Sequence, residues 1–394
     1  MTPNTDFESI TESGPLVREL RERIRRSGPI TFRAFMEAAL YHPQFGYYPA
    51  AAAQGGHGRT FGVTSAAVTS RGGDFVTSPE VHPVFGALVG RTLLEMWEGM
   101  RRPGRFDVVE QGGGSGLLAR DILRWARGND ADFAAAVRYV MVERSPSMRA
   151  AQERVLGELD LADGAVVWVE ELPTGIEGVV LSNELVDAFP VHRVVRKGGV
   201  LQEVHVAVED DRFVDHLAPL STPALQSYFE ALGLLPGANA FAEVNLDAIE
   251  WMRTAAAALS RGYVLTFDYG NEAADLYASW RKDGTLLCFY KQSASSDPYQ
   301  RIGKQDMTAS VDFTTLKRTG EEAGLTTLAM TDQSSFLVRL GIGEGIAAVQ
   351  GEMEEYFARR KVVMDLIDPA RLGRIKVLLQ GKGVLGEAPA GFRE

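Results

Sequence analysis

A glycine-rich run narrows the folds open to this chain more than any other part of its sequence. The run is Glu110-Gln-Gly112-Gly-Gly114-Ser-Gly116, and it follows an apolar stretch of strand length and precedes a helical pattern. Glycine lets the backbone turn sharply and approach a ligand without a Cβ clash. The helix that follows offers free N–H groups and a positive dipole end, which suit a carboxylate or a phosphate. The run therefore predicts a ligand-binding turn between a strand and a helix.

Short apolar runs and helical patterns alternate around this turn. They are the strand-length runs 106–110, 138–143, 165–170 and 178–183, and the helical stretches 84–100, 116–127 and 146–158. Strands that alternate with helices are typical of a parallel sheet covered on both faces. The sequence therefore predicts an α/β fold with a doubly wound sheet.

The remaining segments predict additions to this sheet. Two helices are expected near the start, the second over 30–40 with Thr31 as its N-cap. An insertion is expected at about 190–260, with a hairpin turning at Gly198–Gly199 and then two helices over 222–233 and 241–260. The last elements expected are strands at 263–270, 285–290, 325–330 and 335–339, a helix over 312–323, and a helical tail over 343–379.

Composition excludes several classes of site. The 52 acidic against 41 basic residues give a net charge of −11, which does not favour nucleic acid as a partner. The single cysteine, Cys288, excludes an internal disulfide and a cysteine zinc site, and no spacing of acidic residues indicates a metal site. The first ten residues lack a targeting pattern, and no apolar run is long enough to span a membrane. We therefore expect a cytoplasmic protein without a membrane span.

Two cofactors fit the glycine-rich turn. Glu143 ends the next strand, where it can accept hydrogen bonds from both ribose hydroxyls of an adenosine. Nicotinamide sites favour G-x-G-x-x-G or A, which Gly114, Gly116 and Ala119 match loosely. The complete acid-x-G-x-G-x-G pattern instead favours S-adenosylmethionine, since the acid at the strand end can accept bonds from that cofactor's ammonium group.

Several separate motifs resemble those of the MidA/DUF185 family over roughly residues 15–342. They are GPITFRAFMEAALYHPQFGYY (28–48), GDFVTSPEVHPVFG (73–86), EQGGGSGLLARDILR (110–124), VERSPSMRAAQ (142–152), SNELVDAFPVHR (182–193), FDYG (267–270) and DMTASVDFTTL (306–316). The resemblance implies a class I methyltransferase, Rossmann-like fold with S-adenosyl-L-methionine as cofactor. With the elements expected from the sequence, it divides the chain into a helical N-terminal segment with a glycine-rich lid loop (1–100), a methyltransferase core (101–342) with the insertion at about 190–260, and a C-terminal helical tail (343–394).

The resemblance also implies which residues contact the cofactor. They are Ser78, Pro79, Glu80, Glu110, Gly112, Gly114, Gly116 and Glu143. Of these, Ser78, Pro79 and Glu80 match a loop expected to fold over the cofactor, and their alternative role is to cap the helix that follows.

Polar residues after two strands are the candidates for the acceptor side. Asn183, Glu184 and Asp187 follow one strand, and Asp268 ends a later one. An amide and a carboxylate at that edge can hold a guanidinium through charge-assisted, bidentate bonds. The alternative for Asp187 is a helix-cap or salt-bridge role, and the alternative for Asp268 is a turn-capping role.

The resemblance thus implies a methyltransferase acting on a protein arginine, and it makes a subunit of respiratory complex I one candidate substrate. The alternatives are a small-molecule acceptor, a non-catalytic assembly factor that keeps the fold, and an NAD-dependent oxidoreductase. One departure bears on the acceptor. Relatives often have histidines in the stretch that corresponds to 289–300, where this chain has none and Gln292 and Ser296 stand instead.

Overall fold

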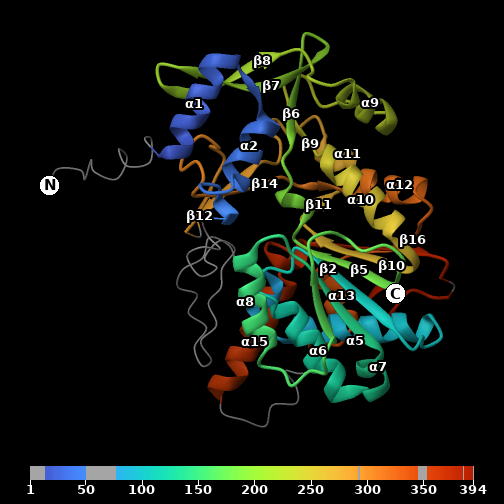
Figure 1. The fold of residues 1–394 in the computed structure, drawn as a ribbon. Helices are drawn as coiled ribbons and strands as arrows, with labels where there is room; N and C mark the ends of the chain where they lie inside the picture. Colours follow the sequence, from blue (N-terminus) through green and yellow to red (C-terminus); the bar gives the residue numbers. More distant parts are fainter. Residues whose placement is uncertain (1–13, 50–76, 292, 345–352, 385, 394) are drawn as a thin grey trace.

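The chain forms a large seven-stranded sheet with helices on both faces and a second, five-stranded sheet beside it (Figure 1). The structure, a computed structural model, describes residues 14–49, 77–291, 293–344, 353–384 and 386–393. The lid loop expected over 50–72, and Gln292, lie outside these residues.

The large sheet has the order β16-β17-β10-β5-β2-β3-β4. Its strands are β2 (Phe106–Gln111), β3 (Val137–Val142), β4 (Val166–Val169), β5 (Ile176–Asn183), β10 (Leu259–Asp268), β16 (Thr326–Asp332) and β17 (Lys376–Lys382). The five strands from β10 to β4 pair in parallel, while β17 runs antiparallel to both of its neighbours. The α/β sheet predicted from the sequence is confirmed, with an antiparallel strand added near one edge.

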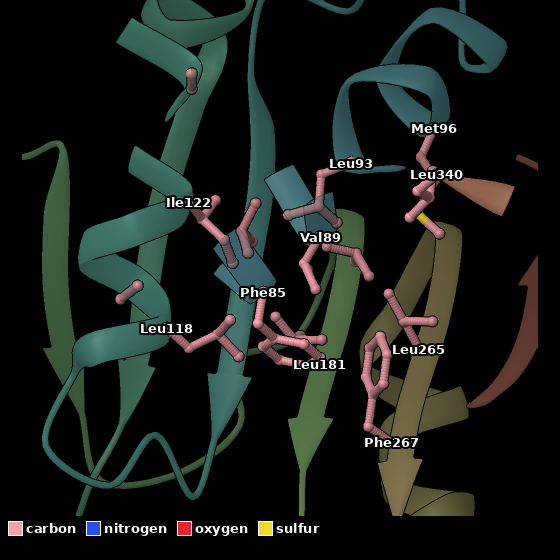
Figure 2. Close-up of a cluster of buried hydrophobic side chains, with 14 of the residues drawn as sticks. Phe85, Val89, Leu93, Met96, Leu118, Ile122, Leu181, Leu265, Phe267 and Leu340 are labelled. Carbon is pink, nitrogen blue, oxygen red and sulfur yellow. The ribbon is translucent and has the colours of Figure 1, made fainter. Parts of the chain in front are cut away.

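Alternating side chains on the central strands bury both faces of this sheet. Val108 belongs to the core under α5 (Val84–Gly99) and α6 (Leu117–Asn129), and its neighbour Val109 belongs to the core under α10 (Leu246–Ala258) and α12 (Phe313–Glu322). Figure 2 shows the first of these cores, in which side chains of α5 and α6 meet those of β5 and β10. Both faces are covered, as a doubly wound sheet requires.

The second sheet is built from the insertion and the start of the chain. Its strands are β1 (Ile30–Thr31), β6 (His192–Lys197), β7 (Val200–Glu209), β8 (Arg212–Ala218) and β9 (Phe241–Val244). The predicted turn at Gly198–Gly199 is confirmed, because β6 and β7 pair on either side of it. Side chains of α1 (Pro15–Ser27) and α2 (Phe32–Tyr41) share a core with β7 and β8. The first two helices therefore pack on the insertion.

The smaller elements complete the fold. They are the helices α4 (Ser78–Val81), α7 (Ala131–Ala136), α8 (Pro146–Leu156), α9 (Pro223–Leu232), α11 (Ala273–Leu276), α13 (Gln333–Arg339) and α15 (Met353–Ile367), and the strands β11 (Gly270–Asn271), β12 (Leu287–Tyr290), β13 (Ser293–Ser295), β14 (Asp306–Thr308) and β15 (Val311–Asp312). No helix within the described ranges is long and apolar enough to cross a membrane.

Two predictions at the C-terminal end were wrong. The tail expected to be helical over 343–379 contains α15, but from Lys376 onward it forms β17, which lies between β16 and β10. The strand expected at 335–339 is the helix α13, whose first turn is capped by Asp332 accepting from the Ser335 N–H at 2.8 Å. Short apolar runs fit either a buried strand or a buried helix, and only the packing partner decides between them.

Two further predictions were wrong in detail. The strand expected at 285–290 does not join the large sheet, and instead forms a three-stranded sheet with β13 and β14. The helix expected over 241–260 starts at Leu246, because residues 241–244 form β9 at the edge of the second sheet. The division of the chain into three domains stays a prediction.

The predicted cap of α2 gives a modest stability test. The Thr31 hydroxyl accepts from the Ala34 N–H at 3.2 Å. Thr31→Ala should therefore lower the free energy of unfolding by about 1 kcal/mol, as loss of an N-cap does. Thr254→Ala is the matched control, since Thr254 is exposed within α10 and only bonds back to its own helix. Equal denaturation midpoints for the two variants would contradict the cap.

Candidate active site

The glycine-rich turn borders a pocket at the carboxyl ends of β2 and β5. These two parallel strands are neighbours near the middle of the sheet, where the strand order changes direction. Doubly wound sheets bind ligands in the crevice at such a point. The pocket has an empty volume of about 430 Å³, counted out to the surrounding solvent, and is lined by Thr77, Pro79, Glu80, Glu110, Gly112, Gly113, Gly114, Ser115, Leu117, Leu118 and Asn183.

The backbone of the turn needs its glycines. Gly112 has φ +71°, and a Cβ there would lie 2.8 Å from Leu185 Cδ1. Gly116 has φ +85°, and a Cβ there would lie 3.4 Å from the Cα of Gln152. A side chain at either position would strain the backbone, and one at Gly112 would also clash with Leu185. The turn therefore leaves room for a ligand at the start of α6, as the sequence predicts.

Glu110 places a buried carboxylate at the edge of this pocket. Its side chain is 2% exposed, and its Oε2 accepts a hydrogen bond from the Tyr139 hydroxyl at 2.8 Å. Burial raises the pKa of Glu110 to about 7, and the bond from Tyr139 opposes that rise. A carboxylate held like this gains most from a cationic partner, because a buried charge is costly until it is paired.

Glu143 lies behind the turn and outside the lining of the pocket. Its Oε1 accepts from the Ser145 N–H at 2.7 Å, and its Oε2 accepts from Gln152 Nε2 at 3.2 Å. Burial raises the pKa of Glu143, while these hydrogen bonds lower it. Its position after β3 is the one expected for a ribose-binding acid.

The residues of the loop expected to cover the cofactor, 78–80, have two different roles. Pro79 and Glu80 line the pocket, and Glu80 closes a capping box with Thr77 at the start of α4. Ser78 is fully buried outside the lining, where its hydroxyl donates to Gln333 Oε1 at 3.0 Å. The alternative role weighed for this loop, as a helix cap, is present at α4, with Thr77 as the capping residue.

Ser78→Ala tests this division. Because the hydroxyl bonds to Gln333 of α13, its loss should cost about 1 kcal/mol of folding free energy, the usual net value of a hydrogen bond. The Kd for S-adenosylhomocysteine should stay within about threefold of wild type, since a bond between Ser78 and Gln333 that is kept in both the free and the ligand-bound protein changes binding little. Calorimetry and thermal melts measure both. A large loss of affinity at unchanged stability would show instead that Ser78 contacts the cofactor, as the resemblance implied.

Asn183 lines the same pocket as Glu110, and Glu184 follows it at the end of β5. The Asn183 side-chain N–H donates to Glu184 Oε1 at 3.0 Å, and the Ser78 N–H lies 3.4 Å from the same oxygen. Glu184 has φ +51°, a left-handed conformation that a non-glycine residue adopts at some cost. Asn183 Oδ1 is buried and has no hydrogen-bond donor among the described residues. Such strain and an unmet acceptor are typical of a functional site.

Asp268 and Asp187 hold the turn that follows Glu184. Asp268 Oδ2 accepts from the Leu185 N–H at 3.2 Å and from the Val186 N–H at 2.8 Å, and its Oδ1 accepts from the Tyr269 N–H. Asp187 is buried in the next turn, where its backbone carbonyl accepts from Ala309. Neither carboxylate lines the pocket. Asp268 therefore fits its alternative, turn-forming role, and a catalytic part for either residue stays a prediction.

Two residues of the site were missed by the sequence analysis. Tyr139 stands in an apolar strand and reaches Glu110 across to the next strand, and Gln152 lies on α8 and contacts both Glu143 and the turn. A tyrosine in a strand buried on both faces signals a buried hydroxyl that needs a partner. Gln152 gave no signal, because one glutamine on a helix is ordinary.

Comparisons with known proteins agree with this geometry. Residues 88–331 match the family described as "Putative S-adenosyl-L-methionine-dependent methyltransferase". A mitochondrial protein arginine methyltransferase NDUFAF7 homolog of Drosophila melanogaster is 30% identical, over 97% of this chain and 88% of its own length. The NDUFAF7 protein of Mus musculus is 28% identical, over 91% and 82%.

Two solved structures from Burkholderia thailandensis share the whole fold. One, described as a "likely methyl transferase" bound to S-adenosyl-homocysteine, has a TM-score of 0.85 and 31% identity and covers 99% of this chain and 97% of its own. The other has a TM-score of 0.83 and 29% identity, and covers 100% and 98%. The Rossmann-like class I fold expected from the sequence is thereby confirmed.

The expected cytoplasmic location was wrong. The relatives from Drosophila melanogaster, Mus musculus and Homo sapiens are named as mitochondrial proteins. The prediction depended partly on the single cysteine. A chain without disulfides suits any reducing compartment, so the cysteine count cannot tell one such compartment from another.

Proposed function

Because the chain belongs to the family of S-adenosyl-L-methionine-dependent methyltransferases, we propose that it transfers methyl groups to an arginine side chain of a protein. The cofactor is S-adenosyl-L-methionine, which decides between the two cofactors that the glycine-rich turn left open. The relatives named above carry protein arginine methyltransferase in their names, which supports the same acceptor here. A subunit of respiratory complex I is the candidate substrate protein to which the family resemblance points.

The residues of the pocket fit the cofactor. When bound, S-adenosyl-L-methionine supplies an activated methyl group. We assign its ammonium group to Glu110, whose buried carboxylate gains a cationic partner, and its carboxylate to the N–H groups at the start of α6. We assign its ribose hydroxyls to Glu143. A Cβ at Gly113 would lie 2.5 Å from Met141 Cε and 3.0 Å from the Glu110 carboxyl carbon, so only glycine lets the turn pass this close to Glu110.

The buried acceptor atom of Asn183 is the observation that carries the arginine proposal. Its Oδ1 lacks a donor in the part of the chain that the structure describes, and the bond to Glu184 fixes which way the amide faces. A guanidinium presents five N–H donors in one plane, so it can satisfy this oxygen and face a carboxylate together. Leaving a buried acceptor unmet costs about 1–3 kcal/mol, which an arginine substrate would offset.

These residues would position the attacking nitrogen. Methyl transfer would form a bond between the arginine nitrogen and the methyl carbon while the methyl–sulfur bond breaks and S-adenosylhomocysteine leaves. The protein's main tasks are to orient that nitrogen and to stabilise the changing charge. Asn183 would hold one N–H of the guanidinium. Glu184 and Asp187 would balance its charge and receive the proton released late in the reaction, since a free guanidinium is too weak an acid to lose it first.

Labelling with methyl-labelled cofactor tests the acceptor class. Purified protein and labelled S-adenosyl-L-methionine are added to an extract of mitochondrial proteins, and the labelled material is analysed by mass spectrometry. We expect one or two methyl groups on an arginine of a protein, and none when the Asn183→Leu variant is used. Label found only in small molecules would contradict the arginine proposal and show that the methyl acceptor is a small molecule. No label, with the cofactor still bound, would favour a non-catalytic assembly factor.

A further inference from the structure

Gln152 connects three parts of the cofactor site from behind. Its side chain is fully buried on α8. The amide Nε2 donates to the carbonyl of Gly114 at 2.9 Å and to Glu143 Oε2 at 3.2 Å, and its Oε1 accepts from Trp168 Nε1 of β4 at 3.0 Å. One side chain thus ties the glycine-rich turn to the acid after β3 and to the next strand of the sheet.

The chemistry around Gln152 admits one orientation of its amide. Gly114 offers a carbonyl and Glu143 a carboxylate, and both can only accept, so both need the N–H groups of the amide. The indole of Trp168 can only donate, so it needs the amide oxygen. Both N–H groups are used, and neither glutamate nor an apolar side chain could make this set of bonds.

Glu143 depends on this amide for its place. Within the described residues, Gln152 is the only side chain that hydrogen-bonds the Glu143 carboxylate, whose other partners are backbone N–H groups. No ion pair to Glu143 is formed in those same ranges. The bond from Gln152 therefore sets the position of one carboxylate oxygen relative to the glycine-rich turn.

We propose that Gln152 is a positioning residue that holds Glu143 in register with the glycine-rich turn, so that both ribose hydroxyls of the cofactor are bound. The proposal rests on the assignment of the ribose to Glu143. Gln152 acts through Glu143 and Gly114 and does not itself touch the cofactor. Its effect should then be confined to ligands that carry both hydroxyls.

The test compares two ligands that differ only in these hydroxyls. Calorimetry gives the Kd of S-adenosylhomocysteine and of its 2′,3′-dideoxy counterpart for wild type and for Gln152→Met, which keeps the side-chain length without polar atoms. We expect the wild-type preference for the hydroxylated ligand to fall about tenfold in the variant, the effect of one charge-assisted hydrogen bond. The Kd of the dideoxy ligand should change less than about threefold, because the lost bond acts through the ribose.

Trp168→Phe provides a milder second variant if Gln152→Met does not fold. It removes the indole N–H that donates to Gln152 Oε1 and keeps an aromatic ring on a half-buried residue. We expect the same ligand preference to fall, by about threefold, since the amide keeps its other bonds. A wild-type preference in the folded variants, or an equal loss for both ligands, would overturn the positioning role.

Glu143→Ala separates this proposal from the assignment beneath it. It should abolish the preference, and adding Gln152→Met to it should then change the preference no further, because the two residues act as one unit. If Glu143→Ala retains the preference, the ribose assignment fails and the Gln152 proposal fails with it. If Glu143→Ala abolishes the preference while Gln152→Met retains it, only the positioning role is lost.

Discussion

Replacing Asn183 by leucine should slow methyl transfer by about a hundredfold or more, the cost of misplacing a reacting group. Leucine has a similar volume and removes the buried Oδ1 that lacks a donor among the described residues. The lost contact is one that we assign to the acceptor, so the Kd for S-adenosylhomocysteine should stay within about threefold, the scale of one neutral hydrogen bond or less. Single-turnover transfer and calorimetry measure the two effects separately.

Ser182→Ala is the matched control for this variant. Ser182 precedes Asn183 on β5, and successive side chains of a strand point to opposite faces, so its side chain is directed away from that of Asn183. Its hydroxyl also lacks a hydrogen-bond partner among the residues described, so each of the two variants removes one buried oxygen atom that has no partner there. Near-normal transfer by Asn183→Leu, or an equal loss in both variants, would remove Asn183 from the acceptor site.

Local patterns predicted the parts of the fold that depend on nearby residues. The glycine-rich turn, the hairpin at Gly198–Gly199 and the cap at Thr31 each follow from a few neighbouring side chains, and all are present. Glu110 was predicted at the pocket because its place at the carboxyl end of a strand puts it at the edge of the sheet where ligands bind. The class of fold could be inferred because the alternation of strands and helices is itself a sequence pattern.

Contacts between distant residues could not be predicted in this way. β17 is a strand because it fills a place between β16 and β10, more than a hundred residues from β10. Ser78 leaves the pocket because Gln333 of α13 takes its hydroxyl, and Gln152 becomes important only where Glu143 and Gly114 meet. In each case the partner in space decides the role, and the sequence around the residue contains no trace of that partner.

Glu110→Gln should weaken the binding of S-adenosylhomocysteine by about 1.5–3 kcal/mol, the range for a hydrogen bond to a charged group. The amide has the shape of the carboxyl group and can still accept from the Tyr139 hydroxyl, so the packing should remain. 5′-Methylthioadenosine is the matched control ligand, because it keeps the nucleoside and lacks the ammonium group assigned to Glu110. Its affinity should change little, and a loss equal to that of S-adenosylhomocysteine would contradict the assignment.

The pH dependence of binding provides the stricter test of Glu110. With its pKa raised to about 7 by burial, the carboxyl group is largely protonated in the free protein at pH 6 and ionised at pH 8. The ligand ammonium group needs the ionised form, so wild-type affinity for S-adenosylhomocysteine should be about tenfold weaker at pH 6 than at pH 8. The affinity should level off above pH 7 and lose this dependence in Glu110→Gln. The pKa of Glu143 is also raised, but its effect would appear equally with 5′-methylthioadenosine and can be subtracted.

The same carboxyl group should make the free protein less stable as the pH rises. A folded-state pKa above the unfolded value favours folding of the protonated form, so the cost of burying the charge is absent below about pH 4.5 and complete above about pH 7. At pH 8 the ligand-free Glu110→Gln protein should therefore melt at a higher temperature than wild type, although it binds S-adenosylhomocysteine more weakly. A lower melting temperature for the variant at pH 8 would contradict this role. It would mean that the ionised Glu110 stabilises the folded protein even without a cationic ligand beside it.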